Sequence, residues 1–252
     1  MPPNAISGKA VEEESLTSKK KPKNMGIAEK LARPNILKLH PYRCARDDYS
    51  SGVLLDANEN SLGPAVKEEE LTPGQIKLEL ERYPCPYQIP LKESYAKYRG
   101  ISSPSKIFVG VGSDEAIDLL FRIFCTPGKD NVLTTPPTYG MYKVCAAVND
   151  VEVLNVPLTS NFDLRIPEML DAVNERTKLM FVCSPGNPTA KAIPLEDVKA
   201  IASNARYTGL VVVDEAYVDF SSKGSAVQLV DEFPNIVVLQ TLSKAFGLAG
   251  IR

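Results

Sequence analysis

Short apolar runs that alternate with helical stretches are the feature that most constrains the fold of this chain. From Ile36 onward, runs rich in Val, Ile and Leu recur between segments of helical periodicity. Several runs are continuously apolar, which is typical of strands covered on both faces. The alternation predicts an α/β fold with a doubly wound, mainly parallel sheet, whose ligand site lies at the carboxyl ends of its strands. The expected strands are 107–110, 131–135, 151–156, 179–183, 210–214 and 236–241.

Helices are expected between these strands. Residues 113–124 open with Ser-Asp-Glu, which favours a capped helix start, and carry apolar side chains on one face. Another helix begins at Pro194 and ends before Gly209, and two shorter patterns lie at 166–174 and 91–98. The first 34 residues differ, because their Pro, Ser, Lys and Glu content buries too little apolar area to offset the entropy of ordering. We therefore expect a disordered tail over 1–34 and one domain over 35–252.

Charge, hydropathy and cysteine content exclude several function classes. The 29 basic and 31 acidic side chains give a formal net charge of −2, which leaves no overall positive field for nucleic acid. No apolar run approaches the roughly 18 residues of a transmembrane helix, and the start of the chain has no hydrophobic leader, so we expect a cytoplasmic protein without a membrane partner. The five cysteines never form a Cys-x-x-Cys pair, which indicates reduced thiols. His40 is the single histidine, which excludes a histidine-rich metal site.

Residues suited to ligand binding follow several of the expected strands. Gly110 and Gly112 permit a tight turn into a helix whose free amides suit a phosphate, although an ordinary capped turn uses the same residues. Tyr139 follows another strand, where it suits either stacking on a planar ligand or a structural role. Asn187 lies in a loop that also fits a plain turn. Each of these patterns has an ordinary structural interpretation when it is taken alone.

Three residues together point to one cofactor. Asn187, Asp214 and Lys244 each stand at or just beyond the end of an expected strand, so one ligand at the sheet edge can contact all three. A buried Asp214 requires a cationic or hydrogen-bonding partner, and a lysine is the nucleophile of Schiff-base chemistry. Pyridoxal 5′-phosphate needs a lysine for its aldehyde, an aspartate for its ring nitrogen and an anion cradle for its phosphate. The combination therefore predicts this cofactor.

The chain also carries motifs that occur together in one enzyme family. They are Leu55-Asp56-Ala57-Asn58-Glu59-Asn60, Arg82-Tyr83-Pro84, Gly112-Ser113-Asp114-Glu115, Pro136-Pro137-Thr138-Tyr139-Gly140-Met141-Tyr142, Ser184-Pro185-Gly186-Asn187-Pro188-Thr189, Asp214-Glu215-Ala216-Tyr217 and Thr241-Leu242-Ser243-Lys244-Ala245-Phe246. With them the chain resembles fold-type I pyridoxal-phosphate-dependent aminotransferases, most closely the histidinol-phosphate aminotransferases of histidine biosynthesis, over residues 35–252. The resemblance implies transfer of an amino group between glutamate and imidazole-acetol phosphate, which yields 2-oxoglutarate and histidinol phosphate.

The resemblance also implies roles for individual residues. Lys244 bonds to the cofactor aldehyde and then shuttles a proton, while Asp214 keeps the pyridine nitrogen protonated. Asn187 and Tyr217 hydrogen-bond the phenolic oxygen, and Tyr139 stacks on the ring. The catalytic residues are thus Lys244, Asp214 and Tyr217. The phosphate is held by Ser113, Asp114, Ser243 and Arg252, with Tyr83 contributed by the neighbouring subunit of a homodimer.

Two departures from the family pattern accompany these expectations. The family usually has Asn-Asn-Pro-Thr-Gly where this chain has Gly186-Asn187-Pro188-Thr189-Ala190. Family members also continue beyond Arg252 through a strand inserted into the sheet and a small C-terminal domain, so the resemblance implies that the large, cofactor-binding domain is incomplete here. Two unpaired strand edges would follow, and we expect the 252-residue chain alone to be poorly stable and inactive.

Two other functions stay open at this stage. The cofactor motifs are shared with related aminotransferases of aromatic or phosphorylated amino acids and with pyridoxal-phosphate decarboxylases. An interpretation of another class is an inactive truncated fragment that only binds the cofactor or a partner subunit.

Overall fold

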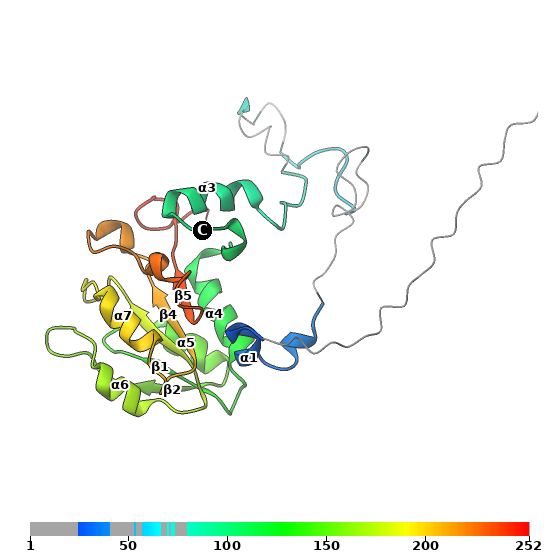
Figure 1. Cartoon of the computed structure of the whole chain (residues 1–252). Coiled ribbons are helices and arrows are strands. Elements are labelled where there is room, and N and C mark those ends of the chain that lie inside the picture. Colours follow the sequence, from blue (N-terminus) through cyan, green and yellow to red (C-terminus); the bar gives the residue numbers. More distant parts are fainter. Residues whose placement is uncertain are drawn as a thin grey trace, which may run out of the picture.

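Five parallel strands form the sheet of this computed structural model, which describes residues 25–40, 53, 57–66, 70, 72–73 and 80–251 (Figure 1). The strand order is β2-β1-β3-β4-β5, so the chain winds outward in both directions from the boundary between β1 and β3. Such a boundary is where doubly wound sheets open a crevice for a ligand. The predicted fold class is confirmed. The strands are β1 (Asn131–Thr134), β2 (Glu152–Asn155), β3 (Thr177–Cys183), β4 (Leu210–Asp214) and β5 (Ile236–Leu239).

Alternate residues of the strands face two separate cores. On β3, Met180 and Val182 join the core that includes α6 (Ile166–Ala172) and α7 (Leu195–Ala202). Leu179 and Phe181 alternate with these residues along the strand, so they join the core on the opposite face of the sheet. Figure 1 shows helices on both sides of the sheet, which explains why the central strands are continuously apolar. The second core is covered by α4 (Gly112–Phe124), α5 (Met141–Val148) and α1 (Ile27–Leu31).

Helix α3 (Ile89–Arg99) lies above β5 in Figure 1 and is attached through polar contacts. The guanidinium of Arg99 donates two hydrogen bonds of 2.7 Å to the carboxylate of Asp219. Asp219 belongs to the 3-10 helix η5 (Val218–Phe220), which follows β4. These hydrogen bonds lower the pKa of Asp219, so its carboxylate stays ionised and paired. The short helices elsewhere are η1 (Ile36–Lys38), η4 (Pro104–Lys106) and η6 (Ala226–Leu229).

Among the described residues, the structure lacks one predicted strand and contains one helix that was not predicted. Residues 107–110 were expected to form a strand, but they pair with no strand in the described part of the chain. A β-branched, apolar sequence becomes a strand only when a neighbour accepts its backbone hydrogen bonds, and Phe108 stays exposed here. Conversely, α5 was not expected, because its apolar residues follow the Pro136-Pro137 loop without a cap signal.

Part of the segment predicted as a tail is ordered in the structure. Within 1–34, the structure describes residues 25–34, and there α1 packs Ile27 and Leu31 against the second core. The N–H of Arg33 donates to the carbonyl of Ile123, and its guanidinium donates to the carbonyl of Arg122. This part of the tail is therefore ordered by tertiary contacts that its composition does not reveal. Residues 1–24 lie outside the described residues.

Four of the five cysteines lie in the described part of the chain. Cys125, Cys145 and Cys183 are buried free thiols, Cys85 is exposed, and Cys44 lies outside the described residues. His40 is exposed, as expected of a surface residue. Among the helices that the structure describes, none combines the length and apolarity that crossing a bilayer requires.

Candidate active site

A buried carboxylate stands where β4 ends. Asp214 is the last residue of β4 and is 2% exposed. Its Oδ2 accepts a hydrogen bond of 2.6 Å from the hydroxyl of Tyr142 on α5, and its Oδ1 accepts one of 3.2 Å from the N–H of Ala216. Burial raises the pKa of Asp214, and the hydrogen bond from Tyr142 opposes that rise. The predicted need of a buried Asp214 for a partner is confirmed.

Tyr139 joins this carboxylate to the start of α4. Its hydroxyl donates a hydrogen bond of 3.0 Å to Oδ1 of Asp114, and its ring meets the ring of Tyr142 edge-on at 5.7 Å. Burial, together with that hydrogen bond, raises the pKa of Tyr139 to about 12, so the hydroxyl remains a donor at neutral pH. The negative charge of Asp214 raises this pKa further.

The turn into α4 differs in detail from its prediction. Gly112 has φ +74°, a conformation that glycine adopts without strain, as the expected tight turn requires. Ser113 does not cap the helix, because the N-cap is Val111 and Ser113 already lies within the first turn. The carboxylate of Glu115 accepts the hydrogen bond from the N–H of Val111 instead. Ser113 therefore remains beside Asp114 at the start of α4.

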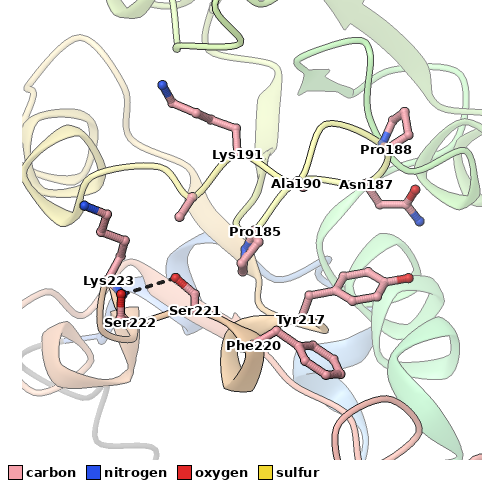
Figure 2. Close-up of a pocket in the computed structure, with 12 residues that line it drawn as sticks. Pro185, Asn187, Pro188, Ala190, Lys191, Tyr217, Phe220, Ser221, Ser222 and Lys223 are labelled. Carbon is pink, nitrogen blue, oxygen red and sulfur yellow. Dashed lines mark hydrogen bonds between the residues drawn. The ribbon is translucent and has the colours of Figure 1, made fainter.

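A cavity of about 960 Å³ opens between the loops that follow β3 and β4. Asn187 comes from the first loop and Tyr217 from the second, and Figure 2 shows their side chains extending toward the same side. Lys191 and Lys223 lie on the opposite side of the cavity (Figure 2). The Lys191 ammonium is paired with Asp163 at 2.8 Å. The loops after two neighbouring strands thus supply an amide and a phenol to one space.

Lys244 lies on the loop after β5 and approaches Tyr217. Its Nζ is 5.5 Å from the centroid of the Tyr217 ring, a cation–π distance. The N–H of Gly247 closes the loop on the carbonyl of Lys244 at 3.0 Å. Phe246 packs edge-on against Tyr98 of α3, with ring centroids 5.7 Å apart. Helix α3 therefore supports the loop that presents the lysine.

The structure brings most of the predicted site residues to one end of the sheet. Contacts connect Asp114, Tyr139 and Asp214 through Tyr142, and Lys244 with Tyr217. Ser243 precedes Lys244, and its hydroxyl lies 3.0 Å from that of Thr241. Tyr83 is 68% exposed, and its N–H donates to the carboxylate of Glu59 at 2.7 Å. Arg252 lies outside the described residues.

Sequence reasoning missed the role of Tyr142. This side chain is 1% exposed and supplies the hydroxyl that Asp214 requires. A signal exists in the sequence, because Tyr142 ends the motif that contains Tyr139, and the two tyrosines are three positions apart. Spacing alone indicates that they lie near each other, but it does not indicate which distant acid the second hydroxyl meets.

Glu215 is the second acid after β4 and has a different environment. Its carboxylate accepts hydrogen bonds from the hydroxyl of Ser225, the N–H of Ala226 and the side-chain amide of Gln240. Burial raises the pKa of Glu215, and these donors oppose the rise. Glu215 thus ties the segment after β4 to the end of β5, while Asp214 bonds to α5.

Comparison with known proteins identifies the family of this chain. Residues 49–252 match the family described as aminotransferase class I and II. The chain belongs to this family. The match includes all the predicted site residues, from Tyr83 to Arg252, and it identifies the fold as that of a fold-type I aminotransferase.

Individual relatives of this aminotransferase-family chain share one name. The chain is 50% identical over 238 residues to histidinol-phosphate aminotransferase of Candida maltosa, a match that covers 88% of this chain and 60% of that protein. It is 47% identical over 242 residues to the enzyme of the same name from Saccharomyces cerevisiae, covering 89% and 60%. The chain thus spans about 60% of the length of the curated relatives it matches.

A solved structure is similar to this aminotransferase-family chain at the level of the fold and of the sequence. It is the crystal structure of histidinol-phosphate aminotransferase from Sinorhizobium meliloti in complex with pyridoxal-5′-phosphate. The TM-score is 0.62 at 27% sequence identity, and the match covers 77% of this chain and 53% of that chain. The sheet described above is therefore part of a larger family fold.

Proposed function

We propose that this chain is the cofactor-binding part of a pyridoxal-phosphate-dependent histidinol-phosphate aminotransferase. The observation that carries the proposal is the buried Asp214 carboxylate, which lies at the same end of the sheet as Tyr217 and the Lys244 amine. Identity of 50% to a histidinol-phosphate aminotransferase supports the substrate class. The amino group passes between glutamate and imidazole-acetol phosphate, so the products are 2-oxoglutarate and histidinol phosphate, in histidine biosynthesis.

The donor chemistry of the site fits pyridoxal phosphate. When bound, the cofactor supplies an electron sink for a substrate carbanion. An ionised Asp214 would pair with the ring nitrogen, and the ring of Tyr139 would pack on the cofactor face. Asn187 and Tyr217 would donate hydrogen bonds to the ring oxygen. An acid, an aromatic face and two neutral donors are the groups that a flat, charged pyridine ring requires.

The remaining residues bind the two reactive ends of the cofactor. Lys244 would hold the aldehyde end of the cofactor, because its amine can serve there both as a nucleophile and as a base that holds or moves a proton. Backbone amides of Ser113 and Asp114 at the start of α4 would hold the phosphate, together with Ser243 and Arg252. These assignments rest on the family motifs and on the common location of the described residues.

A second copy of the chain completes the phosphate site in this proposal. Tyr83 is 68% exposed, and Glu59 holds the Tyr83 backbone by a 2.7 Å hydrogen bond. An exposed phenol on a held segment suits contact with a neighbouring subunit. Sedimentation at several protein concentrations tests for a homodimer. Tyr83→Phe should then weaken cofactor binding without dissociating the homodimer.

The proposed reaction belongs in the cytoplasm, where small phosphorylated metabolites of amino-acid biosynthesis are available. Fractionation of cells that express the tagged chain checks this location.

Cofactor binding is the first test of the proposed function. Pyridoxal phosphate added to the purified chain should produce a visible absorption band, and Lys244→Ala should abolish it. Lys223→Ala is the matched control, because Lys223 lines the same cavity on the side opposite Asn187. If the band is absent from the unmodified chain, or persists in Lys244→Ala, the proposal fails.

Substrate preference separates this proposal from a related aminotransferase. The chain is also similar to aspartate aminotransferase from Thermus thermophilus, at 26% identity and a TM-score of 0.58, which favours a shared cofactor fold. A glutamate-coupled assay with imidazole-acetol phosphate should give turnover, whereas aromatic 2-oxo acids and oxaloacetate should give much less. The reverse order would assign the chain to another aminotransferase.

The same assay addresses the fragment interpretation. The chain spans about 60% of its curated relatives, so we expect it to bind cofactor yet turn over poorly by itself. Robust turnover by the 252-residue chain would contradict that expectation.

A further inference from the structure

Tyr142 occupies a buried position between the acid and the aromatic ring of the site. It lies in the first turn of α5 and is 1% exposed. Its ring stacks on Phe181 of β3, with centroids 4.5 Å apart and planes 18° apart, and meets Tyr139 edge-on at 5.7 Å. Packing on both sides leaves the Tyr142 ring little freedom to rotate, so its hydroxyl has a defined direction.

That hydroxyl is directed at Asp214. It donates to Oδ2 at 2.6 Å, which is a short distance typical of a hydrogen bond to a carboxylate. The other carboxylate oxygen accepts only a longer bond of 3.2 Å from the N–H of Ala216 among the described contacts. Tyr142 therefore supplies the stronger of the two restraints on the orientation of this buried acid.

We propose that Tyr142 is a positioning residue that holds the Asp214 carboxylate ionised and correctly oriented for the ring nitrogen of the cofactor. The inference rests on the proposed function for the identity of the cofactor. Through its contact with Tyr139, the same side chain also fixes the angle between the acid and the stacking ring.

The charge of Asp214 depends on groups from three neighbouring elements. Tyr142 on α5 donates to it, Cys183 on β3 lies beside both of them, and Asp114 on α4 opposes its ionisation. Burial raises the pKa of Asp214, while Tyr142 lowers it. Removal of the Tyr142 hydroxyl should therefore make Asp214 keep its proton to higher pH, which disfavours the ionised form that the cofactor needs.

The chain contains a matched control for this residue. Tyr207 is also a buried tyrosine, 3% exposed, and its hydroxyl donates at 2.7 Å to the carbonyl of Leu210, at the other end of β4. Tyr142→Phe and Tyr207→Phe each remove one hydroxyl that bonds to the same strand. Only the first removes a donor from an ionisable group.

The first measurement needs no cofactor. Urea unfolding of the 252-residue chain should show that Tyr142→Phe increases the unfolding equilibrium constant on the order of tenfold at pH values where Asp214 is ionised. This increase should shrink as the pH is lowered and Asp214 takes up its proton. Tyr207→Phe should change the constant by a factor that does not depend on pH across the same range.

The second measurement follows the cofactor. Titration of the visible band should show about tenfold weaker binding of pyridoxal phosphate to Tyr142→Phe than to the unmodified chain. The acid limb of the binding–pH curve should also move to higher pH in Tyr142→Phe and stay in place in Tyr207→Phe. A merely structural tyrosine would lower stability without moving this limb.

The outcomes separate this inference from the proposed function. The positioning role would be overturned if the two variants had equal, pH-independent effects, or if the acid limb did not move in Tyr142→Phe. Cofactor binding by the unmodified chain would still uphold the proposed function in that case. Failure of the unmodified chain to bind pyridoxal phosphate would overturn both the function and the role at the cofactor. The urea series would then still decide whether Tyr142 stabilises the Asp214 carboxylate.

Discussion

The hydroxyl of Tyr95 on α3 donates a 2.6 Å hydrogen bond to the side-chain oxygen of Gln240, just beyond β5. The amide nitrogen of the same Gln240 donates to the buried carboxylate of Glu215 at 2.8 Å. One side chain therefore connects α3, the end of β5 and the segment after β4. Because Gln240 lies four residues before Lys244, this connection also supports the loop that presents the lysine.

Replacement of Gln240 should weaken this connection. Gln240→Ala removes the acceptor of Tyr95 and one donor of Glu215, so we expect the free energy of unfolding to fall by about 1–3 kcal/mol. Gln228→Ala is the control, because Gln228 is exposed. Urea denaturation measures both. Equal stabilities of the two variants would show that the bridge contributes nothing measurable.

Asp214 should make the cofactor-free chain less stable as pH rises. Burial raises its folded-state pKa above the ordinary value of 3.8, so its contribution to stability is fully present below pH 3.8 and is lost as pH rises through the folded-state value. Asp214→Asn removes this loss and should stabilise the cofactor-free chain at neutral pH, while weakening cofactor binding. Thermal unfolding at several pH values checks this prediction. If the melting temperatures of Asp214→Asn and of the unmodified chain change with pH in the same way, the prediction is contradicted.

Thiol labelling should distinguish exposed from buried cysteines. Burial raises the pKa of Cys125 to about 12 and those of Cys145 and Cys183 to about 11, so these thiols are both inaccessible and protonated at neutral pH. An alkylating reagent should modify Cys85 in the native chain and the three others only after unfolding. Peptide mass spectrometry identifies the labelled sites. Rapid native labelling of Cys183 would contradict the buried position at the end of β3.

Gly209, just before β4, should not tolerate a side chain. A Cβ at this position would lie 2.6 Å from the carbonyl oxygen of Lys178 and 2.7 Å from that of Thr177. We expect Gly209→Ala to cost about 1–3 kcal/mol, because the backbone of β3 must shift. Gly140→Ala is the control, since nothing lies within 4 Å of its Cβ and its φ is −67°. Equal melting temperatures for the two variants would refute the close packing of Gly209.

Continuous apolar runs explain why most of the sheet was predictable. Strands β3, β4 and β5 contribute side chains to both cores. A strand buried on both faces has a continuous apolar sequence, which is easy to recognise. Residues 107–110 carry the same signal but form no strand in the described structure, because pairing requires a neighbour that local sequence does not specify. Helix α5 was missed for the opposite reason, since its short apolar segment is ordered by the core it joins.

The sequence by itself determined the fold class, the family and the placement of residues at or beyond the ends of the strands, among them Asp214 at the end of β4 and Lys244 on the loop after β5. Strand order, the contact of Tyr142 with Asp214 and the network of Glu215 were decided only by the tertiary structure. The physical reason is that periodicity and strand ends specify which face or edge a residue occupies, whereas a hydrogen bond between residues 72 positions apart depends on how α5 packs against the sheet.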